Sequence, residues 1–208
     1  MNSSADLPML SNSLVQLFVD CAVQEVGADE LQAILTEAQL PPAAIERAHL
    51  VQLDGVEAAR LYASIQQALR LYYGRGARGT LLRIGAGMWN RKVEHSNLLE
   101  KAELEIVRRL PVPARRRRVL ELLAGAMQEG GGSASVHSLD LDLVLVDHSG
   151  AATVNQTSSE PICFVTLGLI QAALFWAAGQ EADMEEIACK AIGAPACEFR
   201  IKPGAATR

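Results

Sequence analysis

The residues with the clearest chemical potential lie in the last third of the chain. Cys163 is followed by Glu186, Cys189 and Cys197, and the last three form the pattern E-x(2)-C-x(7)-C. A turn at 193–195 would bring Cys189 and Cys197 together across a hairpin. Zinc accepts thiolates and carboxylates, and a set of four protein ligands is typical of a structural site. The spacing therefore indicates a structural metal site.

Two features leave this interpretation open. Cys189 and Cys197 could instead be cross-strand thiols or a disulfide, with Cys163 as a small apolar residue of a buried helix. In a flat strand, Glu186 and Cys189 point to opposite faces, so Glu186 reaches a metal only through a bulge or a twist. Glu185 shares a face with Cys189 and is the alternative ligand.

A glycine motif upstream has the letters of a nucleotide site. Residues 74–79 read G-R-G-A-R-G and satisfy G-x-G-x-x-G. A dinucleotide fingerprint follows a strand, whereas this one follows a helical pattern that ends at Tyr73. We therefore expect a glycine-broken connection between helices. Because reduction needs a hydride donor and no other nucleotide or flavin motif is visible, we do not expect catalysis.

A run of four arginines has two interpretations. Arg115, Arg116, Arg117 and Arg118 stand near a predicted helix start, where cations oppose the helix dipole. They could form a patch for an anionic ligand or an acidic partner protein. Alternatively, the run is a solvated turn in which Arg117 pairs with Glu121.

Composition excludes several classes of protein. The chain has 208 residues, a formal net charge of −5 and a hydrophobic content of 50%, as in a globular protein. Its acidity argues against a general nucleic-acid binder. The N-terminus lacks the pattern of a signal peptide, so we expect a cytoplasmic protein with reduced thiols. The uncharged stretch between Glu160 and Glu181 is barely long enough to span a bilayer and predicts a buried helix.

Hydrophobic periodicity predicts a helical first half. An apolar stripe at helical spacing covers 11–25 and continues at 29–38. Asp54 and Glu57 resemble a capping box that opens a third helix. Further helices are expected at 80–92, at 98–110, and in the segment that carries Val119, Leu122, Leu123 and Ala126 before the glycines at 130–132.

The second half changes to a period of two. Leu139, Leu141, Leu143 and Leu145 alternate with other residues, which predicts one half-buried strand with Asp140 and Asp142 solvated on its opposite face. We expect 151–158 to return antiparallel. The apolar helix to Ala178 follows, and 184–192 and 197–202 form a hairpin. The predicted fold class is α+β, with a helical half followed by strand, strand, helix and hairpin.

The tail carries a family resemblance. Residues 186–193 (EIACKAIG) and 197–201 (CEFRI) resemble the closing signature of the vinyl-reductase-like small-molecule-binding family. That family includes bacteriochlorophyll 4-vinyl reductase proteins of the BchJ type and the sensor domains of phenol- and xylene-responsive activators. The resemblance is less specific at 73–76 and 82–85, and it covers roughly 61–202. It implies an α+β fold related to TRAPP subunits and nitric-oxide sensor domains.

The resemblance also implies site residues. In the aromatic sensors a structural zinc is held by a cysteine before the long helix and by a glutamate and two cysteines at the hairpin. These positions correspond to Cys163, Glu186, Cys189 and Cys197, which matches residue types and order. The histidine and tryptophan that line the phenol pocket of the sensors have no equivalent pair here. The candidate ligand contacts are therefore Trp89, His137, Phe175 and Trp176, with core packing as the alternative for the last two.

Three functions are compatible with these residues. The first is a zinc-stabilised protein that binds or delivers a tetrapyrrole intermediate of (bacterio)chlorophyll biosynthesis or a comparable apolar ligand. The second is a stand-alone sensor for small aromatic molecules that acts through protein contacts, since no DNA-binding or ATPase module follows here. The third is a genuine vinyl reductase. We expect one domain, with 1–51 as a helical extension that supports a homodimer, 52–203 as the ligand-binding part and 204–208 as a tail.

Overall fold

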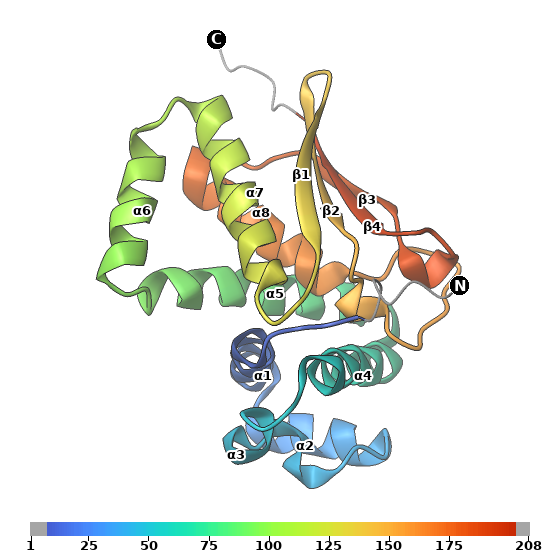
Figure 1. Cartoon of the computed structure of the whole chain (residues 1–208). Helices are drawn as coiled ribbons and strands as arrows, with labels where there is room; N and C mark the ends of the chain where they lie inside the picture. Colours follow the sequence, from blue (N-terminus) through green and yellow to red (C-terminus); the bar gives the residue numbers. More distant parts are fainter. Residues whose placement is uncertain (1–7, 203–208) are drawn as a thin grey trace.

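The computed structural model describes residues 8–202, which form a lower group of helices and an upper sheet backed by two helices (Figure 1). The helices, in chain order, are α1 (Asn12–Val26), α2 (Ala28–Glu37), η1 (Pro42–Ile45), α3 (Arg47–Leu50), α4 (Gly55–Tyr73), η2 (Gly74–Gly76), α5 (Ala77–Glu94), α6 (Leu98–Arg109), α7 (Val112–Gln128), η3 (Ala151–Thr153), α8 (Phe164–Ala178) and η4 (Lys190–Ile192). The strands are β1 (Ala134–Leu139), β2 (Asp142–Asp147), β3 (Met184–Ala188) and β4 (Cys197–Ile201).

Local sequence signals set the ends of the long helices. Asp54 Oδ1 accepts hydrogen bonds from the N–H groups of Val56 and Glu57, and Glu57 accepts one from the Asp54 N–H. This capping box satisfies backbone donors at the start of α4, as the sequence predicts. The short helix η2 joins α4 to α5, so the glycine motif at 74–79 is a connection between helices, as expected.

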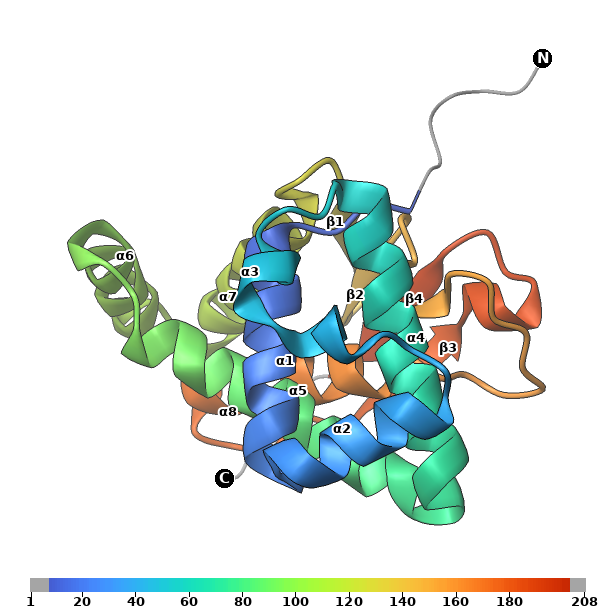
Figure 2. The same cartoon turned by 90° about the horizontal axis from the view of Figure 1, so that it is seen from below.

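Two glycines let α5 and α8 cross closely at the centre of the molecule. A Cβ atom added to Gly85 would lie 2.0 Å from the backbone oxygen of Val165, and one added to Gly168 would lie 2.1 Å from that of Leu82. Each helix therefore approaches the backbone of the other at a residue without a side chain. This crossing joins the lower helices to the layer beneath the sheet; seen from below, α1, α2 and α4 lie in front of α5 and α8 (Figure 2).

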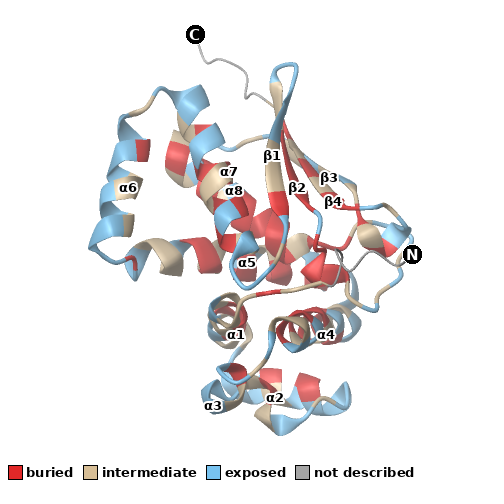
Figure 3. Ribbon diagram, in the orientation of Figure 1, coloured by how far each residue is buried: buried red, intermediate tan, exposed pale blue. Residues whose placement is uncertain are grey.

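The sheet is antiparallel in the order β1-β2-β4-β3. Helix α7 packs against β1 and β2, and α8 packs against α7 and β3. Burial is concentrated on α8 and the central strands, while α6 and the tip of the β1–β2 hairpin are exposed (Figure 3). The edge strand β3 is held only by β4, which makes its attachment to the start of α8 important for the site described below.

The strand prediction for 139–146 was wrong. The alternating leucines span a hairpin whose two-residue loop is Asp140 and Leu141, with Leu139 paired to Asp142. Asp140 has a φ of 54°, which aspartate tolerates better than most residues. Asp142 is not solvated opposite the leucines, because it forms a 2.6 Å ion pair with Arg200 on β4. The alternation misled because both sides of a tight hairpin share the same period of two.

Other boundaries also differ from the predictions. Residues 151–158 do not form a return strand; they contain η3, and β1 supplies the partner of β2 instead. The predicted strand at 184–192 ends at Ala188 and is followed by η4. Proline at the second position of α7 starts that helix as well as closing α6, since proline suits a first turn. No helix between residues 8 and 202 is long and apolar enough to cross a membrane.

The apolar stripe of α1 is used within the chain. Val15, Phe18 and Ala22 are fully buried, and α1 packs against α4 and α5. The N-terminal helices are therefore part of the core. The expected homodimer stays a prediction.

Candidate metal centre and ligand cavity

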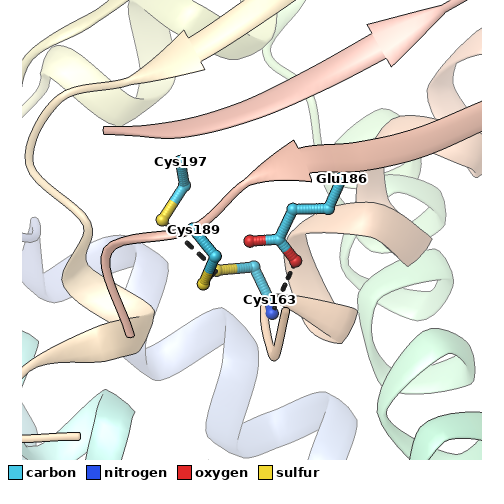
Figure 4. A group of neighbouring side chains, drawn as sticks. All are labelled: Cys163, Glu186, Cys189 and Cys197. Atoms are coloured by element: carbon cyan, nitrogen blue, oxygen red, sulfur yellow. Dashed lines mark hydrogen bonds between the residues drawn. The ribbon is translucent and has the colours of Figure 1, made fainter. Parts of the chain in front are cut away.

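Three cysteines and a glutamate converge where the β3–β4 hairpin meets the start of α8 (Figure 4). One ligand atom from each of Cys163, Glu186, Cys189 and Cys197 lies within 4.8 Å of all the others. The Cys163 sulfur is 3.8 Å from that of Cys189 and 3.5 Å from that of Cys197. Tetrahedral zinc with bonds of about 2.3 Å places sulfurs about 3.8 Å apart. The cluster therefore has the dimensions of a metal site.

A β-bulge brings Glu186 into this cluster. The β3–β4 register pairs Glu186 with Phe199 and Ala188 with Glu198, so Ile187 is an extra residue on β3. The extra residue places Glu186 and Cys189 on the same side of the strand. Glu185 points elsewhere and lies 3.6 Å from Lys202. The bulge is the feature that the sequence argument required of Glu186.

The carboxylate of Glu186 has one satisfied and one free oxygen. Oε2 accepts a 3.0 Å hydrogen bond from the backbone N–H of Cys163. Oε1 is buried and has no partner among the described residues. A buried acceptor without a partner is costly, and a cation bound among the sulfurs would satisfy it. The donor set and this orphaned oxygen together fit a metal ion.

The four ligating groups compete for negative charge when no cation is present. Burial raises the pKa of Glu186 to about 8. Hydrogen bonds from the thiols of Cys163 and Cys197 lower the pKa of Cys189, while hydrogen bonding to Cys189 and Cys197 and burial raise that of Cys163. One thiolate is thus stabilised by two thiols. A bound divalent cation would instead favour deprotonation of all the ligands.

Arg70 is a part of this site that sequence reasoning missed. It lies on α4, where Nη2 donates to Gln156 Oε1 and Nη1 is buried without a partner. Burial lowers the pKa of Arg70, and the nearby Cys163 and Cys189 oppose this shift. Three thiolates and a carboxylate would exceed the charge of a divalent ion, so Arg70 offsets part of the excess. No motif marks this residue, because it is far from the first ligating cysteine in sequence and is brought near only by the fold.

A separate cavity lies between the N-terminal helices and the α7–α8 layer. Its volume is about 40 Å³. Most of its wall is apolar, from α1 and the segment before it, α5, α7 and α8; the residues are Met9, Leu10, Leu14, Leu17, Met88, Leu123, Ala126, Met127, Ala151, Ala152 and Leu169. Such a wall, completed by a few polar groups, is typical of a small-molecule site.

The polar residues that line this cavity are buried. Tyr62, Thr166, Asp147 and Ser149 are each at most 9% exposed. Burial raises the pKa of Tyr62, against the effect of hydrogen bonds with Thr166 and Gln66. Asp147 Oδ1 accepts a 2.9 Å hydrogen bond from the Gly150 N–H. Hydroxyl and carboxyl groups are therefore available to orient a ligand.

The structure does not bring the four predicted ligand contacts together. Trp89 is buried and packs edge-to-face on Trp176 at 5.5 Å, and Arg108 lies over the Trp176 ring. Phe175 is 55% exposed, because it faces outward from α8. His137 is exposed on β1 and lies 2.8 Å from Ser135 Oγ. None of them lines the cavity, so the cavity was not found from sequence; its signal was spread over apolar residues that look like ordinary core.

The arginine run is divided among different partners. Arg115 donates to the carbonyls of Leu110 and Ala177, which lies at the end of α8. Arg117 pairs with Glu121 at 2.9 Å, as predicted, and Arg118 pairs with Glu103 at 2.6 Å. Arg116 is buried. The four side chains do not form one shared patch.

Solved structures share the fold. An H-NOX protein from S. oneidensis in the Fe(II)NO ligation state superimposes with a TM-score of 0.58 at 14% identity, over 93% of this chain and 98% of that one. An oxygen-binding H-NOX domain related to soluble guanylate cyclases gives 0.53 at 14% identity, over 93% and 94% of the two chains. With so little of the chain left uncovered, the N-terminal helices belong to the shared fold. The expected likeness to nitric-oxide sensor domains is confirmed.

The C-terminal segment identifies the family resemblance. Residues 146–203 match the family model of the 4-vinyl reductase (V-4-R) domain, and this segment contains Cys163, Glu186, Cys189 and Cys197. The phenol-responsive sensory domain of the transcription activator PoxR, solved with phenol, superimposes with a TM-score of 0.52 at 17% identity, over 70% of this chain and 73% of that one. These findings confirm a domain of the 4-vinyl reductase type. No curated protein matches the chain in sequence.

Proposed function

We propose that this chain is a metal-stabilised small-molecule-binding domain that takes a small aromatic or similar apolar ligand into the cavity beside α1. The observation that carries the proposal is the lining of the cavity, where an apolar wall meets the Tyr62 hydroxyl and the Asp147 carboxyl. The phenol-bound sensory domain with the same fold supports this ligand class. Ligand binding would alter the packing of α1 and so be read by a partner protein.

The size of the cavity favours a small ligand that opens it slightly. A volume of about 40 Å³ exceeds the roughly 10–15 Å³ that one water needs but falls short of the roughly 150 Å³ of a cavity known to hold benzene. Met9, Met88 and Met127 line it, and methionine side chains adapt readily to a ligand. Their rotation, with a small outward movement of the segment around Met9, would admit one aromatic ring.

The binding of phenol and toluene tests this proposal. We expect calorimetry to show saturable binding of both by the full chain. Tyr62→Phe should weaken phenol about tenfold, the value of one lost hydrogen bond, and leave toluene within about twofold. Tyr73→Phe is the matched control, because the Tyr73 hydroxyl bonds to Glu30 outside the cavity. Failure of both ligands to bind would refute the proposal for this ligand class.

A tetrapyrrole is the second candidate ligand. The observation in its favour is the fold shared with H-NOX domains, one of which was solved in a study of heme redox potential and covers 93% of this chain. A ring of that size would require a much larger displacement of α1, and no histidine lines the cavity to ligate an iron. Delivery of a (bacterio)chlorophyll intermediate would produce an absorbance shift on adding chlorophyllide. A saturable shift with one ligand per chain would favour this candidate over the small aromatic.

For the metal, we propose zinc held by Cys163, Glu186, Cys189 and Cys197. Sulfur ligands and tetrahedral spacing favour zinc over magnesium or calcium, which prefer oxygen. Its role is structural: it would fasten the edge strand β3 and the η4 turn to the start of α8. Native mass spectrometry of reduced protein should show one zinc per chain, lost on acidification and in Cys189→Ser. Cys21→Ser is the control, because Cys21 is a buried cysteine outside the cluster.

A further inference from the structure

Arg116 is a buried cation without a partner. Its side chain lies in the second turn of α7, and the residue is only 9% exposed. Within residues 8–202 it has neither a hydrogen bond nor an ion pair, and its Nε is completely enclosed. Its neighbours Arg115, Arg117 and Arg118 all have partners. Burying a charge without a partner is strongly unfavourable, so this position calls for an anion from outside the protein.

A pocket of about 340 Å³ lies where this anion would bind. Arg116, Arg117, Lys202 and the hydroxyl-bearing Ser138 line it, and no carboxylate does. Lys202 is 3.4 Å from Asp183 and Arg117 is paired with Glu121, so Arg116 is the cation left uncompensated there. The first turn of α7 adds to the positive potential, because its N–H groups are free and the helix dipole is positive at this end.

The remaining walls of the pocket are apolar. Leu141, Leu143 and Ile201 face the cations across it. A guanidinium presents two parallel N–H groups that match a carboxylate or a phosphate. A fully hydrated inorganic ion would leave the apolar wall uncovered, whereas an anion with an apolar body would cover it.

We propose that this pocket binds an organic carboxylate with a small apolar body, and that Arg116 is its bidentate partner. No residue of this pocket lines the cavity beside α1. The site is therefore independent of the proposed ligand cavity, and the two stand or fall separately.

Calorimetric titration of the full chain with three probes tests the ligand class. Hexanoate should bind saturably, while hexanol, which has the same body without the charge, should not bind this pocket. Inorganic phosphate should bind at least about tenfold more weakly than hexanoate. No binding of hexanoate would overturn the proposal, and tighter binding of phosphate would overturn the requirement for an apolar body.

Variants of the arginine run test the role of Arg116. Arg116→Met should abolish hexanoate binding and raise the melting temperature, because it removes a buried charge that has no partner in the free protein. Arg118→Met, on the same helix and paired with Glu103, should keep hexanoate affinity within about twofold and should not raise the melting temperature. Arg116→Lys should bind at least about tenfold more weakly, because lysine lacks the planar fork. Unchanged hexanoate affinity in Arg116→Met or in Arg116→Lys would overturn the assignment.

Discussion

The carboxylate of Glu186 on the edge strand β3 accepts a hydrogen bond from the backbone N–H of Cys163, the residue that precedes α8. This 3.0 Å contact joins the C-terminal hairpin to the most buried helix of the molecule. It leaves the second carboxylate oxygen free beside three sulfurs. One side chain thus connects the packing of the hairpin with the chemistry of the proposed metal site.

Glu186→Gln separates these two roles. Glutamine keeps an oxygen that can accept from Cys163, but it removes the anionic ligand. We expect zinc affinity to fall about 10–100-fold, measured by competition with a chromogenic chelator, with the fold retained. Glu185→Gln is the control, because Glu185 lies at Lys202 outside the cluster. Equal zinc affinity in wild type and Glu186→Gln would remove Glu186 from the ligand set.

Arg70 should tune the metal site without touching the ion. In Arg70→Met the excess negative charge of the ligands loses its nearby cation, so zinc should dissociate faster and at higher pH during acid titration. We expect a loss of zinc affinity of about tenfold by chelator competition. Arg60→Met is the matched control on an exposed position of the same helix. If both variants retain zinc like the wild type, Arg70 acts on packing alone.

The α5–α8 crossing should be intolerant of a single methyl group. Gly85→Ala or Gly168→Ala would place a Cβ 2.0–2.1 Å from a backbone oxygen that cannot move aside. We expect each change to reduce the free energy of unfolding by about 3 kcal/mol or more in urea titrations. Gly125→Ala in α7 meets no atom within 4 Å and should instead stabilise by about 0.5–1 kcal/mol. Comparable effects at all three glycines would contradict the close crossing.

Asp147 should make stability depend on pH. Burial raises its pKa above the usual 3.8, while the N–H groups of Gly150 and Ser149 oppose the shift. The folded state then holds a proton that the unfolded state has lost, so this stabilisation is present below about pH 3.8 and is lost as the pH rises through the folded pKa. Asp147→Asn keeps an acceptor for Gly150 and does not titrate. Its stability relative to wild type should therefore increase between about pH 3.5 and 7 in urea unfolding, and a constant difference would exclude the burial effect.

The sequence predicted the parts of the fold that depend on local signals. Capping residues such as Asp54 act on their own helix, so the start of α4 followed from a short stretch of residues. The order and types of the cysteines and Glu186 also sufficed to propose the cluster, since a turn between Cys189 and Cys197 brings them together. The β1–β2 hairpin failed because leucines on both sides of Asp140 keep the same alternation. A period of two does not show where a chain reverses.

The missed features depend on contacts between distant segments. Arg70, Gly85 and Gly168 carry no local signature of their roles, because what they touch comes from another helix. The cavity is formed by residues such as Leu17 and Met127 that resemble ordinary core residues in sequence. Its existence depends on how well α1 packs on α7 and α8, which periodicity does not determine.

The most direct test of the proposed function is whether a small aromatic ligand enters the cavity beside α1. The chain has five methionines, of which Met9, Met88 and Met127 line the cavity and Met184 lies at another pocket. In protein labelled with ¹³C at the methionine methyl groups, phenol should shift the Met9, Met88 and Met127 resonances along one binding curve and leave Met184 unchanged. Resonances of these three methionines that stay fixed at saturating phenol, or a shift confined to Met184, would contradict the account.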